Sequence, residues 1–216
     1  MLVSPSVISC RLENLASEIS LCEKAGVYSY HLDVMDGSFV PNLTMGPDLI
    51  KAVRRCTSRR LEAHLMIERP DIYAEKFLDA GSDLLFIHGE VLANFKKVID
   101  TIKGSGKKFG IAINPETPVQ KMEKWIAESD TVLLMSVHPG FSGQSFIGSS
   151  VEKIRELRNL IDSRGYSAKI EVDGGVNDKT AQSCVDAGAD ILVSASYIFS
   201  GNIEERIGLL SGLKRS

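Results

Sequence analysis

The 216-residue sequence has no long apolar run, no excess of basic side chains and no closely paired cysteines. None of its apolar stretches approaches the roughly 18 consecutive residues that a membrane-spanning helix needs. Its 25 basic and 28 acidic side chains give a formal charge of −3. Binding to a nucleic-acid backbone requires a basic face, so we expect neither a nucleic-acid partner nor a membrane partner.

The cysteines and the first residues indicate the cellular compartment in which the protein is found. Cys10, Cys22, Cys56 and Cys184 are scattered and form no CxxC pair, which is typical of reduced thiols in a chain of this length. The opening residues have neither the basic region nor the apolar stretch of a signal peptide. We therefore expect a cytoplasmic protein.

Composition favours one ordinary globular unit. Hydrophobic residues make up 44% and charged residues 25% of the chain, which excludes disordered, collagen-like and coiled-coil proteins. Single α/β barrels commonly contain about 200–250 residues, and such a chain buries a sizeable core without disulfides. We expect a single domain over residues 1–216.

Eight short apolar runs rich in β-formers alternate with amphipathic helical patterns. The runs begin near Leu2, Tyr28, Leu61, Leu84, Lys108, Thr131, Lys169 and Ile191. Each gap has room for a helix and two loops, which is the repeating unit of a parallel sheet. The clearest helical periods cover residues 12–24, 72–80 and 151–161. Gly26, Gly81 and Gly188 are predicted to end helices in the left-handed conformation.

Two architectures fit this alternation: a closed (β/α)8 barrel and an open doubly wound sheet. A dinucleotide-binding sheet would place a GxGxxG turn directly after the first strand. The sequence instead has Ser9, Cys10 and Arg11 there, with no glycine. The prediction is an α/β protein with a single (β/α)8 (TIM) barrel.

Polar residues gather where the predicted strands end, which is where a barrel carries its chemistry. His31 and Asp33 are two residues apart and therefore point to the same side of their strand, into the barrel. His64 on the next strand and Asp173 across the mouth can reach the same place. Buried ionisable groups need each other or a metal. The residues alone leave two interpretations, a divalent-metal site and a buried His–Asp ion pair.

Small-residue loops follow the last three predicted strands. They contain Gly140 and Gly143, then Gly174 and Gly175, then residues 194–197. Barrels often bind phosphate with loops in these positions, because glycine lets backbone N–H groups approach an anion. The pattern predicts a phosphate site.

Several motifs together resemble the ribulose-phosphate 3-epimerase family over nearly the whole chain. They are HLDVMDG at 31–37, FVPN at 39–42, HLM at 64–66, NPETP at 114–118, MSVHPGF at 135–141 and EVDGG at 171–175. The resemblance implies a (β/α)8 barrel that interconverts D-ribulose 5-phosphate and D-xylulose 5-phosphate, a reaction of the pentose phosphate pathway. It also implies a homo-oligomer and one divalent metal ion, which could be Zn, Fe, Mn or Co.

The resemblance assigns residues to roles. His31, Asp33, His64 and Asp173 match the metal ligands, and Asp33 and Asp173 also match the acid and base. The segments that match substrate-binding positions contain Ser6, His64, Gly140, Phe141, Ser142, Gly143, Gly174, Gly175, Ala195 and Ser196. Met35, Met66 and Met135 match methionines near the reacting carbons.

The expected chemistry suits two carboxylates. Inverting a carbon beside a ketone removes a proton from one face and returns one to the other, and one fixed base serves only one face. The intermediate is an enediolate, whose negative charge a metal ion stabilises.

The sequence departs from the family pattern near the expected pocket. Cys10, Ser142 and Ala195 stand where other residues are usual. D-allulose 6-phosphate is therefore an alternative substrate, and a barrel that binds a sugar phosphate without turnover is a further alternative. His138 matches no family role; it is either an exposed loop residue or a contact to phosphate or sugar.

Overall fold

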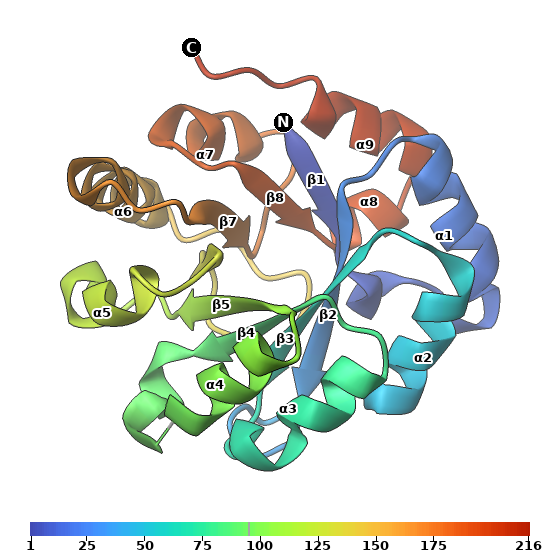
Figure 1. The fold of residues 1–216 in the computed structure, drawn as a ribbon. Coiled ribbons are helices and arrows are strands. Elements are labelled where there is room, and N and C mark those ends of the chain that lie inside the picture. Colours follow the sequence, from blue (N-terminus) through green and yellow to red (C-terminus); the bar gives the residue numbers. More distant parts are fainter. Residues whose placement is uncertain (95) are drawn as a thin grey trace.

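The computed structural model describes residues 1–94 and 96–216, and these form a (β/α)8 barrel, as the sequence predicted (Figure 1). All paired strands are parallel, in the order β1-β8-β7-β6-β5-β4-β3-β2. The bridge between Ser6 and His31 joins β1 to β2 and closes the ring. The helices surround the strands on the outside (Figure 1).

The strands begin within one residue of the predicted positions. Their bounds are β1 Leu2–Pro5, β2 Ser29–Met35, β3 Arg60–Met66, β4 Leu84–His88, β5 Lys108–Ile113, β6 Thr131–Met135, β7 Lys169–Asp173 and β8 Ile191–Ser194. The α-helices are α1 Leu15–Lys24, α2 Pro47–Cys56, α3 Pro70–Asp79, α4 Lys96–Gly104, α5 Glu123–Ile126, α6 Ser150–Arg164, α7 Ala181–Ala187, α8 Ser196–Phe199 and α9 Ile203–Ser211. Short 3₁₀ turns include η1 Val7–Ser9, η2 Leu12–Asn14, η3 Gly89–Asn94 and η4 Val119–Met122.

The helix ends show why the predicted boundaries were close but not identical. The pattern at residues 12–24 opens with the 3₁₀ turn η2, so that α1 begins three residues later than expected. Helix α3 starts at Pro70 because proline fits the first turn of a helix, where its missing N–H is not needed. Gly26, Gly81 and Gly188 have φ of +78°, +109° and +117°, which confirms the predicted left-handed positions.

Two cores hold the barrel together. Outward-facing side chains such as Leu32 and Val34 pack against the helices in the larger one. The interior holds a smaller apolar cluster of Leu84, Phe86, Ala112, Leu133, Met135, Val137 and Val193. These residues come from β4, β5, β6, β8 and the loop after β6. The interior positions of β2, β3 and β7 carry mainly polar groups, with Met35 and Met66 at the ends of β2 and β3 in a separate small apolar cluster. Within the described part of the chain, no helix combines the length and apolar character needed to cross a membrane.

Candidate active site and metal centre

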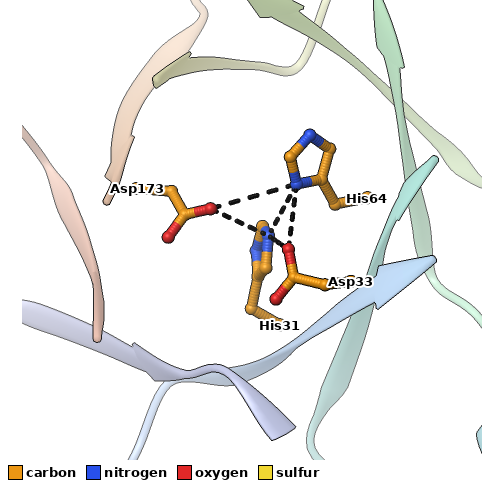
Figure 2. A group of neighbouring side chains, drawn as sticks. All are labelled: His31, Asp33, His64 and Asp173. Atoms are coloured by element: carbon orange, nitrogen blue, oxygen red, sulfur yellow. Dashed lines mark hydrogen bonds and ion pairs between the residues drawn. The ribbon is translucent and has the colours of Figure 1, made fainter. Parts of the chain in front are cut away.

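Four side chains converge inside the barrel near its carboxyl end (Figure 2). His31 and Asp33 come from β2, His64 from β3 and Asp173 from the last position of β7. Asp33 and His64 are register partners in neighbouring strands, so both side chains point inward at one level. Asp173 faces them from β7 (Figure 2).

The spacing of the facing atoms fits a metal ion. Nε2 of His31 lies 3.2 Å from Nδ1 of His64, 3.5 Å from Oδ1 of Asp33 and 3.7 Å from Oδ2 of Asp173. Nδ1 of His64 lies 3.2 Å from Oδ1 of Asp33 and 3.9 Å from Oδ2 of Asp173. Ligands at about 2.0–2.2 Å from a tetrahedral ion are separated by about 3.4 Å. The donor set of two imidazoles and two carboxylates could therefore hold a divalent transition metal.

The pKa values of the two histidines are shifted in opposite directions, although both side chains are buried. Both rings are completely buried. Burial lowers the pKa of His64 to about 3, because the hydrogen bond that His64 donates to Asp33 does not offset the lost hydration. For His31, burial also acts against the charged form, but Asp33, Glu171 and Asp173 together raise its pKa well above the usual range.

The pKa values of the two aspartates are shifted in opposite directions. Burial and the neighbouring charge of Asp33 raise the pKa of Asp173 to about 7. Burial acts in the same direction on Asp33, but the charge of His31 and hydrogen bonds with His31 and His64 keep its pKa below the usual range. The Ser6 hydroxyl donates to Oδ2 of Asp33, which leaves Oδ1 facing the centre.

A second polar layer lies beneath the first, and the sequence reasoning missed it. Nδ1 of His31 donates to Oε1 of the buried Glu171 over 3.1 Å. Glu62 accepts from Ser29 over 2.9 Å, and burial beside Glu171 raises the pKa of Glu62 to about 8. Together His31, Glu62 and Glu171 form a second group that could hold a cation. Strand parity could have found both glutamates, since each lies two residues before a site residue on its strand.

His88, the last residue of β4, also joins the site. Its Nε2 lies 2.8 Å from Nε2 of His64, and its Nδ1 lies 3.2 Å from Oε2 of Glu90. Asp36 does not join it. Oδ1 of Asp36 accepts the backbone N–H groups of Ser38 and Phe39, which shapes the loop after β2.

A cavity of about 460 Å³ opens above the four side chains. It is lined by every expected substrate-binding or reaction-centre residue except His64, namely Ser6, Asp33, Met35, Met66, Met135, Gly140, Phe141, Ser142, Gly143, Asp173, Gly174, Gly175, Ala195 and Ser196. His31 and His64 are fully buried and do not line the cavity. Lining residues that the sequence did not single out include Asn177 and Thr180.

Gly174 and Gly175 form a tight crossing of the loops after β6 and β7. Their φ values are +119° and +65°. A Cβ on Gly174 would lie 2.5 Å from the Val137 side chain, and one on Gly175 would lie 2.6 Å from the backbone nitrogen of Phe146. Larger residues at these positions would displace the cavity wall.

His138 lies apart from the cavity. Its side chain is 67% exposed, and Nδ1 is 3.2 Å from Oε1 of the equally exposed Glu116. This placement matches the exposed-loop interpretation of His138.

Comparison with known proteins agrees with this geometry. The model of the ribulose-phosphate 3-epimerase family matches residues 2–199. Ribulose-phosphate 3-epimerase from Bacillus subtilis is 46% identical, with 91% of each chain covered. That from Chlamydia muridarum is 44% identical, covering 98% of this chain and 95% of the relative.

The solved structures that resemble the chain extend the likeness to the fold. The crystal structure of 3-hexulose-6-phosphate synthase from Salmonella typhimurium superposes with a TM-score of 0.73 at 16% identity, covering 98% of this chain and 97% of that one. At this identity the likeness concerns the barrel alone. Because the family model matches residues 2–199 and the two relatives described above are 44% and 46% identical, the chain belongs to the ribulose-phosphate 3-epimerase family.

Proposed function

We propose that this protein interconverts D-ribulose 5-phosphate and D-xylulose 5-phosphate by inverting C3. The observation that carries the proposal is the pair Asp33 and Asp173, two carboxylates at the floor of one cavity with opposite proton affinities. Groups whose surroundings drive their pKa values apart are suited to act as acid and base in the same reaction.

The proton transfers follow from that difference. Asp33 is the ionised partner and accepts the C3 proton on one face of the substrate. Asp173 is the protonated partner and donates to the other face, because it faces Asp33 across the cluster (Figure 2). In the reverse reaction the two exchange roles, since each transfer leaves the pair in the opposite state. Ser6 holds Asp33 through Oδ2, so that its free oxygen keeps a fixed direction.

We infer that His31, Asp33, His64 and Asp173 hold one divalent cation of the Zn, Fe, Mn or Co type. Imidazole ligands favour these ions over Mg²⁺, which prefers oxygen ligands. The bound cation would supply positive charge that stabilises the negative charge developing on the substrate oxygens.

The rest of the cavity suits the remainder of a sugar phosphate. We assign the phosphate to the backbone of Gly174 and Gly175 together with the segments around Gly143 and Ser196, which line the same cavity. Anchoring this distant group orients C3 between the two carboxylates. Met35, Met66 and Met135 line the cavity with polarisable apolar surface near the reacting carbons.

The alternatives are less well supported. Both relatives described above are ribulose-phosphate 3-epimerases, which favours the pentose phosphate over D-allulose 6-phosphate. The match to the epimerase family over residues 2–199 likewise favours turnover over a barrel that only binds a sugar phosphate. We also infer a homo-oligomer from the family resemblance and a cytoplasmic location from the reduced cysteines. Light scattering would measure the number of subunits in the assembly.

A coupled epimerase assay with both sugar phosphates tests the proposal. We expect turnover of D-ribulose 5-phosphate with a much higher kcat/KM than that of D-allulose 6-phosphate. Preference for the hexulose phosphate would reverse the substrate assignment, and no turnover of either would favour the binding barrel.

A further inference from the structure

The outer ring nitrogen of His64, Nε2, faces another histidine, His88. Nδ1 of His64 faces the cluster of four side chains, and Nε2 points away from it to Nε2 of His88 at 2.8 Å. The other histidine of the centre, His31, instead places its outer nitrogen directly on a carboxylate, Glu171. The two histidines of one site are therefore held by different means.

A carboxylate also ends the longer path. Nδ1 of His88 lies 3.2 Å from Oε2 of Glu90. The other oxygen of Glu90 accepts the backbone N–H of Asn114 at 2.9 Å and the hydroxyl of Thr117. Although burial opposes ionisation, the hydrogen bonds from His88 and Thr117 lower the pKa of Glu90 to about 2. Glu90 is therefore an acceptor at both oxygens.

The protons along this path have one consistent arrangement when a cation is held by Nδ1 of His64. The neutral His64 ring then carries its only proton on Nε2 and donates it to His88. Nε2 of His88 must be a bare acceptor, since two protonated nitrogens cannot approach to 2.8 Å. The proton of His88 then lies on Nδ1 and is donated to Glu90.

The surroundings favour a fixed arrangement. The His88 side chain is fully buried, and the ring of Phe39 covers it with centroids 4.7 Å apart. Glu90 is tied to the loop after β5 by Asn114 and Thr117. The path thus runs from β3 through β4 to the loop after β5, and three neighbouring parts of the barrel determine how one ring is oriented.

We propose that His88 and Glu90 are positioning residues that hold His64 in the Nε2–H tautomer, with its Nδ1 lone pair directed at the cation. The inference rests on the proposed metal centre. A ligating histidine commonly donates its outer N–H to a carboxylate, and loss of such a partner typically weakens metal binding about 10–100-fold. In this protein the carboxylate acts through an intervening imidazole.

The substitution Glu90→Gln should reverse the proton order. The amide oxygen is held by the two donors at Asn114 and Thr117, so that the amide N–H₂ faces His88 and donates to its Nδ1. The His88 proton then moves to Nε2, and His64 must place its own proton on Nδ1, where the cation binds. Glu116→Gln is the matched control, because it removes the same charge at a residue that contacts His138 instead.

Zinc binding and imidazole nitrogen NMR test this inference. We expect zinc, measured by competition with a chelator, to bind about 10–100-fold more weakly to the Glu90→Gln protein than to the Glu116→Gln protein. Spectra of the zinc-loaded wild type should show His64 protonated on Nε2 and His88 protonated on Nδ1. The wild-type spectrum decides the question even if the Glu90→Gln protein does not fold.

Three results would overturn it. One is a His88 ring protonated on Nε2 in the zinc-loaded wild type. Another is equal zinc affinity of the two variants, even with a lower unfolding temperature for Glu90→Gln, which would make Glu90 a purely structural residue. The third is a wild type that binds no zinc, iron, manganese or cobalt. This result would refute the proposed metal centre, whereas the other two would refute only the role of His88 and Glu90.

Discussion

Asp33 on β2 is the register partner of His64 on β3, and Oδ1 of Asp33 lies 3.2 Å from Nδ1 of His64. The pairs on either side, His31 with Glu62 and Met35 with Met66, are also register partners. Two neighbouring strands therefore contribute, in three successive steps, to the second polar layer, to the metal-ligand layer and to the methionines that line the cavity.

Replacing either reactive carboxylate should stop epimerisation. We expect Asp33→Asn and Asp173→Asn each to lower kcat about 10²–10⁴-fold, because each removes proton transfer at one face of C3. In one variant, exchange of the C3 proton with solvent could persist, and NMR in deuterated water detects it. Asp48→Asn, at a 98% exposed side chain, is the control. Wild-type turnover in both active-site variants would rule out a two-base mechanism.

Removal of metal should abolish activity reversibly. After prolonged chelation we expect no turnover, with recovery on addition of Zn²⁺, Fe²⁺, Mn²⁺ or Co²⁺ and poor recovery with Mg²⁺, which suits oxygen ligands better than imidazole. Metal content measured alongside activity links the two. Full activity in protein shown to be metal-free would contradict the proposal.

Metal binding should release protons and weaken in acid. In the metal-free protein His31 has a raised pKa and Asp173 has one of about 7, so both carry protons at lower pH. A cation competes with these protons and lowers the pKa of both groups, so its apparent affinity should rise with pH. Calorimetry in buffers of different ionisation enthalpy measures the release, which should be larger at about pH 6 than at about pH 8. Equal release at both values would contradict these pKa shifts.

Gly175→Ala should damage substrate binding more than metal binding. The new Cβ would lie 2.6 Å from the backbone of Phe146 at a φ of +65°, a strain of about 1–3 kcal/mol that displaces the cavity wall. We expect a raised KM for the sugar phosphate with unchanged zinc affinity. Gly148→Ala, where a Cβ would meet no neighbour within 4 Å, controls for the substitution itself.

His138→Asn should leave the KM profile unchanged. The ring is exposed, contacts Glu116 and does not line the cavity. We therefore expect no direct contact between the His138 ring and the phosphate. We expect the same KM as in wild type from about pH 6 to about pH 8, the range in which histidine titrates. A raised KM with a flatter pH dependence would instead give His138 a role at the substrate.

Much of the barrel could be predicted from local pattern, because each strand is a short apolar run between helical periods and the two-residue alternation fixes which side faces inward. His31 and Asp33 were placed together in this way. For His138 the sequence left two interpretations, an exposed loop residue and a contact to phosphate or sugar. β6 ends at Met135, and strand alternation no longer determines direction in the turn that follows.

The missed residues needed knowledge of neighbours across the barrel. Glu62 and Glu171 have the right alternation, but only closure of the ring brings them together beside His31. Glu90 lies beyond β4 in a 3₁₀ turn, and its contact with His88 depends on how the loop after β5 returns. Such contacts join distant segments, which sequence periodicity does not relate.

Closure of the barrel has a consequence for its evolution and engineering. The bridge that joins β1 to β2 is formed by Ser6 and His31, and both side chains also serve the reacting groups above it. Substitutions that would strengthen this join for thermal tolerance therefore compete directly with catalysis at the same two positions. Stabilising changes should be sought among the interior side chains of β4, β5 and β6 that do not line the cavity, namely Leu84, Phe86, Ala112 and Leu133.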